Sequence, residues 1–208
     1  MLRIDPARES PQDRPQRFIL YVEGPADRAI LRAWAYRLLP SVSRRLFGAS
    51  VILGGRQPAR ALEHFSGAGG AGAGLHGLCV LDRDDGVQPD PPDSREPGLE
   101  FFTWGRRHIE SYLLVPAAIR RTLRLADNDP RIQRALDEVL PRPADESAYR
   151  QVDAKRLLGP NGALSRALGC PISLPHVARA TRGDELHPDV HRLFEQLRDR
   201  LGVRDFLR

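Results

Sequence analysis

The most constraining stretch of the sequence is an apolar run that leads directly into a group of acids. Leu78–Leu81 are apolar, and Asp82, Asp84 and Asp85 follow at once. Glycines flank this stretch, so the run is expected to be a strand buried on both faces. Ligands of open α/β sheets bind beyond the carboxyl ends of the strands. From this stretch alone, the acids predict either a ligand site or merely an acidic turn that closes a strand.

The spacing of the acids favours a shared cation. Alternate residues of an extended segment point to the same side, so Asp82 and Asp84 can face one ion together. Three acids this close together repel one another unless a positive charge lies between them. A hard divalent cation is therefore one interpretation of the cluster.

A second apolar run also ends at an acid. Arg17–Val22 is expected to be a strand, and Glu23 follows at its tip. Gly24 permits a tight turn and Pro25 suits the first position of a helix, which places Asp27 in the first helical turn. A carboxylate there also stabilises the amino end of a helix, so Asp27 has a purely structural alternative role.

The remaining patterns predict an α/β fold. Further strands are expected at 50–53 and 99–104, with helices after Pro25 and at 58–65, and this order favours a mainly parallel four-stranded sheet flanked by helices. We expect a flexible lead at 1–16, an α/β core at 17–115 and a helical extension at 116–208 that completes the site. Within this extension, helices are predicted near 116–126, 130–140, 152–158, 163–168 and 188–201, with a loop at 142–147.

Composition narrows the class of protein. The net charge of +5 mildly favours a polyanionic partner. Lys155 is the only lysine among 32 basic residues. Either it is there by chance, or its position has a function that requires lysine and that arginine cannot perform. The two cysteines form no CxxC pattern, which argues against a zinc site or a disulfide framework. No apolar run approaches membrane length and no signal peptide is evident, so a cytoplasmic location without membrane contact is expected.

Two further segments have competing interpretations. The glycine-rich stretch 66–74 lacks the GK[ST] ending of a phosphate loop, and a flexible connector is expected there. Arg106, Arg107, His108 and Glu110 precede an apolar run. This second segment is either a charged helix start facing solvent or part of a functional site.

Together these motifs resemble a known family. Glu23-Gly-x-x-Asp27 after one strand and Leu81-Asp82-x-Asp84-Asp85 after another resemble the TOPRIM domain of topoisomerases, primases and some nucleases. The segment from Arg107 to Leu113 resembles the R-x-I-E-N-Y-L element of the overcoming-lysogenisation-defect (OLD) nucleases and related TOPRIM-like anti-phage nucleases. The resemblance covers roughly residues 18–114 and, more weakly, 152–201. The fold it implies is TOPRIM, a Rossmann-like α/β fold.

The resemblance implies a set of site residues. The metal ligands would be Glu23, Asp27, Asp82, Asp84, Asp85 and Glu110, and the catalytic residues would be Glu23, Asp82, Asp84, Glu110 and Lys155. Lys155 matches a downstream basic residue of the family. Two positions depart from the pattern, since His108 replaces a small hydroxyl residue and Ser111 an asparagine. The role of His108 is open between metal, phosphate and packing.

The function implied is metal-dependent phosphodiester hydrolysis. Two Mg²⁺ or Mn²⁺ ions are expected, because such a pair neutralises charge on both the attacking and the leaving oxygen. Arg83, Arg106, Arg107 and His108 are expected to contact nucleic-acid phosphates. DNA is the expected substrate, in a defence or DNA-processing role. Larger members of the family that this chain resembles carry an ATPase fused to the same domain. This chain has no Walker motif, so the resemblance implies that an ABC- or SMC-type ATPase, if one takes part, is a separate chain, and a homodimer is possible.

Other functions of TOPRIM domains fit less well or stay open. Topoisomerase strand transfer needs a nucleophilic tyrosine on a further large domain, and recombination mediators need a four-cysteine zinc site. An RNA-processing nuclease stays open, because the metal chemistry does not distinguish RNA from DNA. A non-catalytic module that binds Mg²⁺ and docks an ATPase or a nucleic acid is the alternative from another functional class.

Overall fold

The computed structural model describes residues 17–83, 96–140 and 145–203. Asp84 and Asp85, as well as the expected lead at 1–16, lie outside the described residues. No helix in the described ranges is both long enough and apolar enough to span a lipid bilayer.

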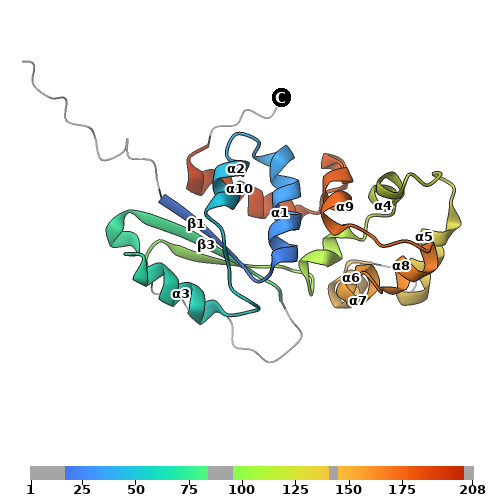
Figure 1. Ribbon diagram of the computed structural model, residues 1–208, viewed down its shortest axis with the longest axis horizontal. Helices are drawn as coiled ribbons and strands as arrows, with labels where there is room; N and C mark the ends of the chain where they lie inside the picture. Colours follow the sequence, from blue (N-terminus) through green and yellow to red (C-terminus); the bar gives the residue numbers. More distant parts are fainter. Residues whose placement is uncertain (1–16, 84–95, 141–144, 204–208) are drawn as a thin grey trace, which may run out of the picture.

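One half of the molecule is built on a four-stranded parallel sheet (Figure 1). Its strands are β1 (Arg17–Val22), β2 (Val51–Ile52), β3 (Leu75–Leu81) and β4 (Leu99–Thr103), in the order β2-β1-β3-β4. All neighbours pair in parallel, with Val22 opposite Val80 and Leu81 opposite Thr103. The predicted α/β fold with a parallel sheet flanked by helices is confirmed. The carboxyl ends of β1 and β3 consequently lie side by side.

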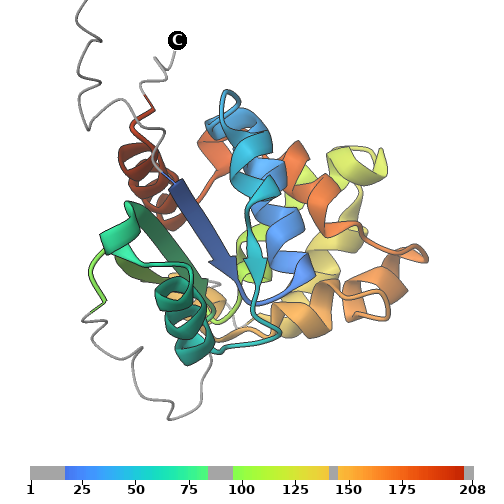
Figure 2. The same ribbon diagram turned by 60° about the vertical axis from the view of Figure 1, so that its left-hand side comes forward.

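Alternate residues of the strands face opposite layers of helices, as the two-residue period of a strand requires. On one face, Tyr21 and Cys79 pack with Phe65 of α3 (Pro58–Gly67). On the other face, Leu20 and Val80 belong to the core formed with α1 (Pro25–Leu38) and α10 (Pro188–Leu201). Figure 2 shows α3 and α1 on opposite sides of the sheet.

The first six helices of the helical extension lie beyond the carboxyl ends of the strands, whereas its last helix, α10, lies against the sheet (Figure 1). The six helices are α4 (Pro116–Leu123), α5 (Pro130–Val139), α6 (Glu146–Gln151), α7 (Ala154–Leu158), α8 (Ala163–Leu168) and α9 (Leu174–Ala180). Buried residues of the extension, such as Ile132 and Leu164, are in the same hydrophobic cluster as Leu20 of the sheet. The extension and the α1 side of the sheet therefore share one continuous core.

Several local features differ from the sequence-based expectations. The helix α6 begins at Glu146, inside the stretch 142–147 that was expected to be a loop, because the Asp145 side chain accepts a hydrogen bond from the Ala148 N–H and caps the helix. The strand β3 begins at Leu75, directly after the left-handed turn residue Gly74 (φ +68°). The helices α2 (Ser43–Gly48) and α9 were not among the elements expected from the sequence.

Three connections in the described ranges contain 3₁₀ turns. These are η2 (Ala71–Ala73) in the glycine-rich connector, η3 (Ile109–Leu113) after β4, and η4 (Gly183–Glu185) before α10. The charged segment 106–110 thus leads into a single buried 3₁₀ turn, where an α-helix start was one interpretation.

A buried polar cluster joins η3 to α6 and α10. The Tyr112 hydroxyl donates to Asp189 Oδ2 at 2.6 Å and accepts from the Arg106 backbone N–H at 2.9 Å. The Arg106 guanidinium pairs with Glu146 at 2.8 Å and lies over the rings of Tyr112 and Tyr149. These contacts fix the η3 turn against helices that are distant in sequence.

We predict that Tyr112→Phe lowers the free energy of unfolding by about 1–3 kcal/mol, because a buried carboxylate and a backbone N–H both lose a partner. Urea unfolding measures the change. The exposed Tyr36→Phe serves as the control and should stay within about 0.5 kcal/mol of the wild type. Equal stability of the two variants would contradict the structural role of the Tyr112 hydroxyl.

Candidate metal centre

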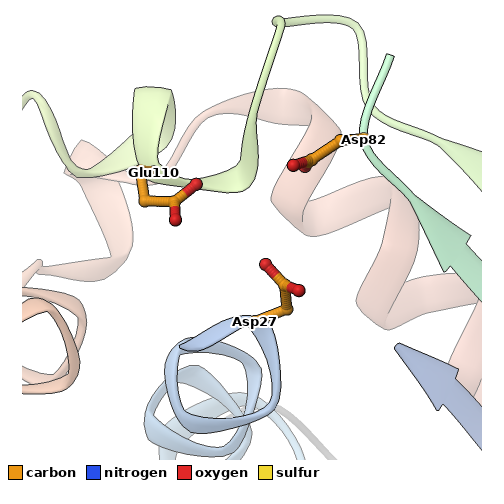
Figure 3. Close-up of side chains that lie close together, drawn as sticks. All are labelled: Asp27, Asp82 and Glu110. Atoms are coloured by element: carbon orange, nitrogen blue, oxygen red, sulfur yellow. The ribbon is translucent and has the colours of Figure 1, made fainter. Parts of the chain in front are cut away.

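Three carboxylates from three segments meet at the carboxyl end of the sheet (Figure 3). Asp27 lies in the first turn of α1, Asp82 follows β3, and Glu110 lies in η3. One oxygen of each lies within 4.8 Å of those of the other two. We call these residues the acidic triad.

The positions of the triad follow from the fold around it. The β1 and β3 strands are parallel neighbours, so the start of α1 and the residue after β3 reach the same edge. Asp27 is held by its own helix end, where its Oδ2 accepts from the Gly24 N–H at 2.5 Å. Asp82 Oδ1 accepts from the Ile109 N–H at 2.9 Å, which brings Glu110 alongside.

Asp82 has a partner for each of its oxygens. Besides the Ile109 N–H on Oδ1, the Lys155 ammonium donates to Oδ2 at 2.8 Å. The Asp82 side chain is only 3% exposed, and an ionised group buried this deeply needs both charge compensation and hydrogen bonds. The single lysine of the chain provides the compensating charge.

Lys155 is presented by the short helix α7. Asp153 caps this helix, and its side chain accepts from the Arg156 N–H at 3.1 Å. Burial would lower the pKa of Lys155, but the hydrogen bond with Asp82 and the charges of the triad outweigh it and raise the pKa. Lys155 is therefore a permanent cation beside the triad, and its side chain keeps 47% of its surface exposed.

The other two acids of the triad lack comparable compensation. Burial, followed by repulsion from Asp82, raises the pKa of Asp27 to about 6. Burial is also the largest cause that raises the pKa of Glu110 to about 7, against the lowering effect of Lys155. Glu110 Oε2 is buried without a hydrogen-bond partner.

The triad fits a divalent cation. A bound cation would supply the positive charge that Asp27 and Glu110 lack. It would also give the buried Glu110 Oε2 an interaction partner. Carboxylate oxygens are the ligands that hard cations such as Mg²⁺ prefer. The triad can therefore hold a metal ion.

Glu23 lies next to the triad without joining it. Its Oε1 accepts from the Asp82 N–H at 2.7 Å, so the Glu23 carboxylate holds the backbone directly after β3. Within the described residues, the mutually close ligand atoms are those of the triad alone. Metal ligation by Glu23 stays a prediction, and Asp84 and Asp85, which were also predicted ligands, lie outside the described residues.

The residues expected to contact phosphates are in varied surroundings. The Arg83 guanidinium donates to the carbonyls of Gly105 at 3.1 Å and Arg150 at 2.8 Å. Arg106 is engaged with Glu146, which favours a structural role. His108 is buried, and this burial together with the charge of Lys155 lowers its pKa.

Phosphate contact by these residues and by Arg107 stays a prediction.

Asp153, which caps the helix that carries Lys155, was not among the predicted site residues. An aspartate directly before a short apolar helical stretch is a recognisable helix-capping signal, so the sequence did contain the information.

Comparisons with known proteins found structural likenesses only. The chain is similar in fold to the C-terminal region of the Burkholderia pseudomallei OLD protein, with a TM-score of 0.49 and 20% identity over 89% of this chain and 98% of the other. Two structures of the C-terminal region of the Xanthomonas campestris pv. campestris OLD protein match with a TM-score of 0.48, at 17% and 18% identity, each over 90% of this chain and over 94% and 96% of theirs. No protein-family profile matches, and no curated protein matches by sequence.

We predict that Glu110→Gln becomes more stable relative to the wild type as the pH rises in the presence of EDTA. The folded state raises the pKa of Glu110 from 4.5 to about 7, so the native protein binds the extra proton. Ionisation therefore destabilises the wild type as the pH rises through this window, whereas the glutamine stays neutral.

Urea unfolding of both proteins at pH 5 and pH 8 measures the difference. Comparison with the wild type at each pH cancels the contributions of ionisable groups that the substitution leaves unchanged. The exposed Glu195→Gln is the matched control and should show no such trend. A Glu110→Gln difference that is independent of pH would contradict the prediction. Added Mn²⁺ should stabilise the wild type more than the variant at pH 8.

Proposed function

We propose that this chain is a divalent-metal-dependent nuclease that hydrolyses phosphodiester bonds of DNA. The observation that supports this most directly is the acidic triad with Lys155 hydrogen-bonded to its central member. Carboxylates from separate segments that converge next to a fixed cation are hard to explain as solvated surface charge. The motif resemblance of the sequence to TOPRIM nucleases points to the same chemistry.

Each residue has a role in this proposal. Asp27, Asp82 and Glu110 would hold the ion. A bound cation supplies Lewis-acid activation and charge neutralisation at the phosphate. Lys155 orients Asp82 and, through the exposed part of its side chain, places a positive charge where negative charge develops on the substrate. Glu23 holds the backbone of Asp82 in place.

The proposal extends to the number of ions, the substrate and the partners. A second ion would need ligands besides the triad, for which Glu23, Asp84 and Asp85 are the candidates. DNA is preferred as the substrate from the motif resemblance, while an RNA substrate or a non-catalytic magnesium-binding module are the alternatives. A defence role, an ATPase partner and a homodimer stay predictions.

We predict that Asp82→Asn lowers the rate of Mn²⁺-dependent nicking of supercoiled plasmid at least about 100-fold. The substitution weakens both the binding of the ion and the interaction with Lys155. Gel electrophoresis of the plasmid, with and without EDTA, measures the loss. Circular dichroism checks that the variant is folded. Asp199→Asn, on the exposed end of α10, is the matched control and should nick like the wild type.

Glu23→Ala tests the role of the neighbouring carboxylate in the same assay, and we expect it to lose nicking as well. Full activity of Asp82→Asn and Glu23→Ala would place the active site elsewhere. Plasmid that stays intact with the wild type, together with Mn²⁺ binding in calorimetry, would favour the non-catalytic module.

We predict that Lys155→Ala lowers the nicking rate about 100-fold and that Lys155→Arg does not restore it, because a guanidinium is larger and differs in its hydrogen-bond directions. Single-turnover rates with excess enzyme measure both variants. Rates close to the wild type in Lys155→Ala would show that the lysine only stabilises the fold.

A further inference from the structure

A groove with a cationic lining runs between α1 and α9, beginning at the end of α1 that carries Asp27. Arg28, Arg32 and Tyr36 of α1 and Arg179 of α9 line it, and its volume is about 310 Å³. All of its charged lining residues are arginines. We call Arg28, Arg32, Tyr36 and Arg179 the arginine–tyrosine groove.

Helix α1 links this groove to the acidic triad. Arg28, Arg32 and Tyr36 recur every fourth residue and so lie along one face of the helix. Asp27 is in the first turn of the same helix. With a rise of about 1.5 Å per residue, Tyr36 lies roughly 13 Å along the axis from Asp27, a length that a few nucleotides of a strand cover.

Tyr36 has the properties of a stacking platform. It is 45% exposed and is the one exposed large hydrophobic side chain among the residues that the structure describes. The Arg32 and Arg179 guanidinium carbons each lie 5.7 Å from its ring centroid, and Arg32 donates to its hydroxyl at 3.1 Å. Two helices thus hold the ring in place before any ligand arrives.

The arginines of the groove are available to an anion. Arg32 and Arg179 are exposed, and Arg28 is half-buried with one donor on the Phe47 carbonyl at 2.6 Å. Within the described ranges, none of the three forms an ion pair with an acid. Guanidinium groups suit phosphate oxygens through forked, charge-assisted hydrogen bonds.

We propose that the arginine–tyrosine groove binds a single-stranded segment of the DNA substrate beside the acidic triad. Tyr36 stacks on a base, and Arg32 and Arg179 contact the neighbouring phosphates. This inference rests on the proposed function for its substrate and adds a preference for unpaired strands. Base stacking on an aromatic ring combined with a positive groove is a recurrent, sequence-independent way to hold single strands.

The central experiment compares Tyr36→Ala with Tyr36→Phe. Fluorescence anisotropy measures the affinity of a labelled single-stranded oligonucleotide and of the duplex of the same sequence, in EDTA so that nothing is cleaved. Tyr36→Ala should weaken single-strand binding about tenfold and change duplex binding less than about twofold, because only an unpaired base can stack. Tyr36→Phe keeps the ring and should bind single strands within about twofold of the wild type.

The arginines are tested by the salt dependence of the same binding. Arg32→Ala and Arg179→Ala should each reduce the slope of log affinity against log salt by about 0.7, the value expected for one phosphate contact on a single strand. Arg17→Ala is the matched control, because it removes the same charge at the amino end of β1, at the opposite end of that strand from the triad. Its slope should equal that of the wild type.

Three outcomes would overturn the inference: no single-strand binding by the wild type, equal effects of Tyr36→Ala on single strands and duplex, or no effect on either. Thermal unfolding of the same samples shows whether Tyr36 only joins α1 to α9, since that role would lower the melting temperature without selective loss of single-strand binding. If Asp82→Asn loses nicking but the groove variants bind DNA like the wild type, the nuclease proposal is supported and the groove proposal is contradicted. If Tyr36→Ala selectively loses single-strand binding but the wild type does not nick plasmid, the groove proposal is supported and the nuclease proposal is contradicted.

Discussion

The contact between Lys155 and Asp82 holds the site together. Asp82 follows β3, one of the two inner strands of the sheet, Lys155 comes from the helical extension, and their charged groups lie 2.8 Å apart. A carboxylate buried as deeply as that of Asp82 is stable in ionised form only with such a partner. The extension is therefore part of the candidate site, because it supplies the cation that this site requires.

The remaining acids of the triad are left without this compensation. The single charge of Lys155 compensates about one carboxylate, which leaves Asp27 and Glu110 without a cation of their own. Burial and the neighbouring carboxylates therefore raise the pKa of both groups. Natural sites keep such electrostatic strain where a ligand relieves it. Glu110 Oε2 is also buried without a hydrogen-bond partner, which a cation bound at the triad would compensate.

Much of the sheet could be predicted from the sequence, because uninterrupted apolar runs identify buried strands and the acids at their ends identify the carboxyl edge. Pairing could not be read this way, since only the fold shows that β1 lies beside β3. Lys155 could be singled out because it has no counterpart elsewhere in the chain. The polar cluster of Arg106, Tyr112 and Asp189 could not be predicted, because Asp189 is distant from the other two in sequence and no local motif marks these residues. Only one wall of the groove could be predicted from the sequence, because the apolar periodicity indicates helix α1. The other wall, α9, lies in a segment without a clear pattern.

The continuous core described for the sheet and the helical extension has a consequence for how the chain can be divided. Ile132 and Leu164 are interior residues of the same cluster as Leu20, so a cut between the sheet and the extension would leave both fragments with bare apolar surface. Neither fragment would carry a whole site, because Asp82 and Lys155 would be on different polypeptides. The sheet and the extension thus share one interior, and we expect changes in chain length to be tolerated best at loops that this interior does not touch.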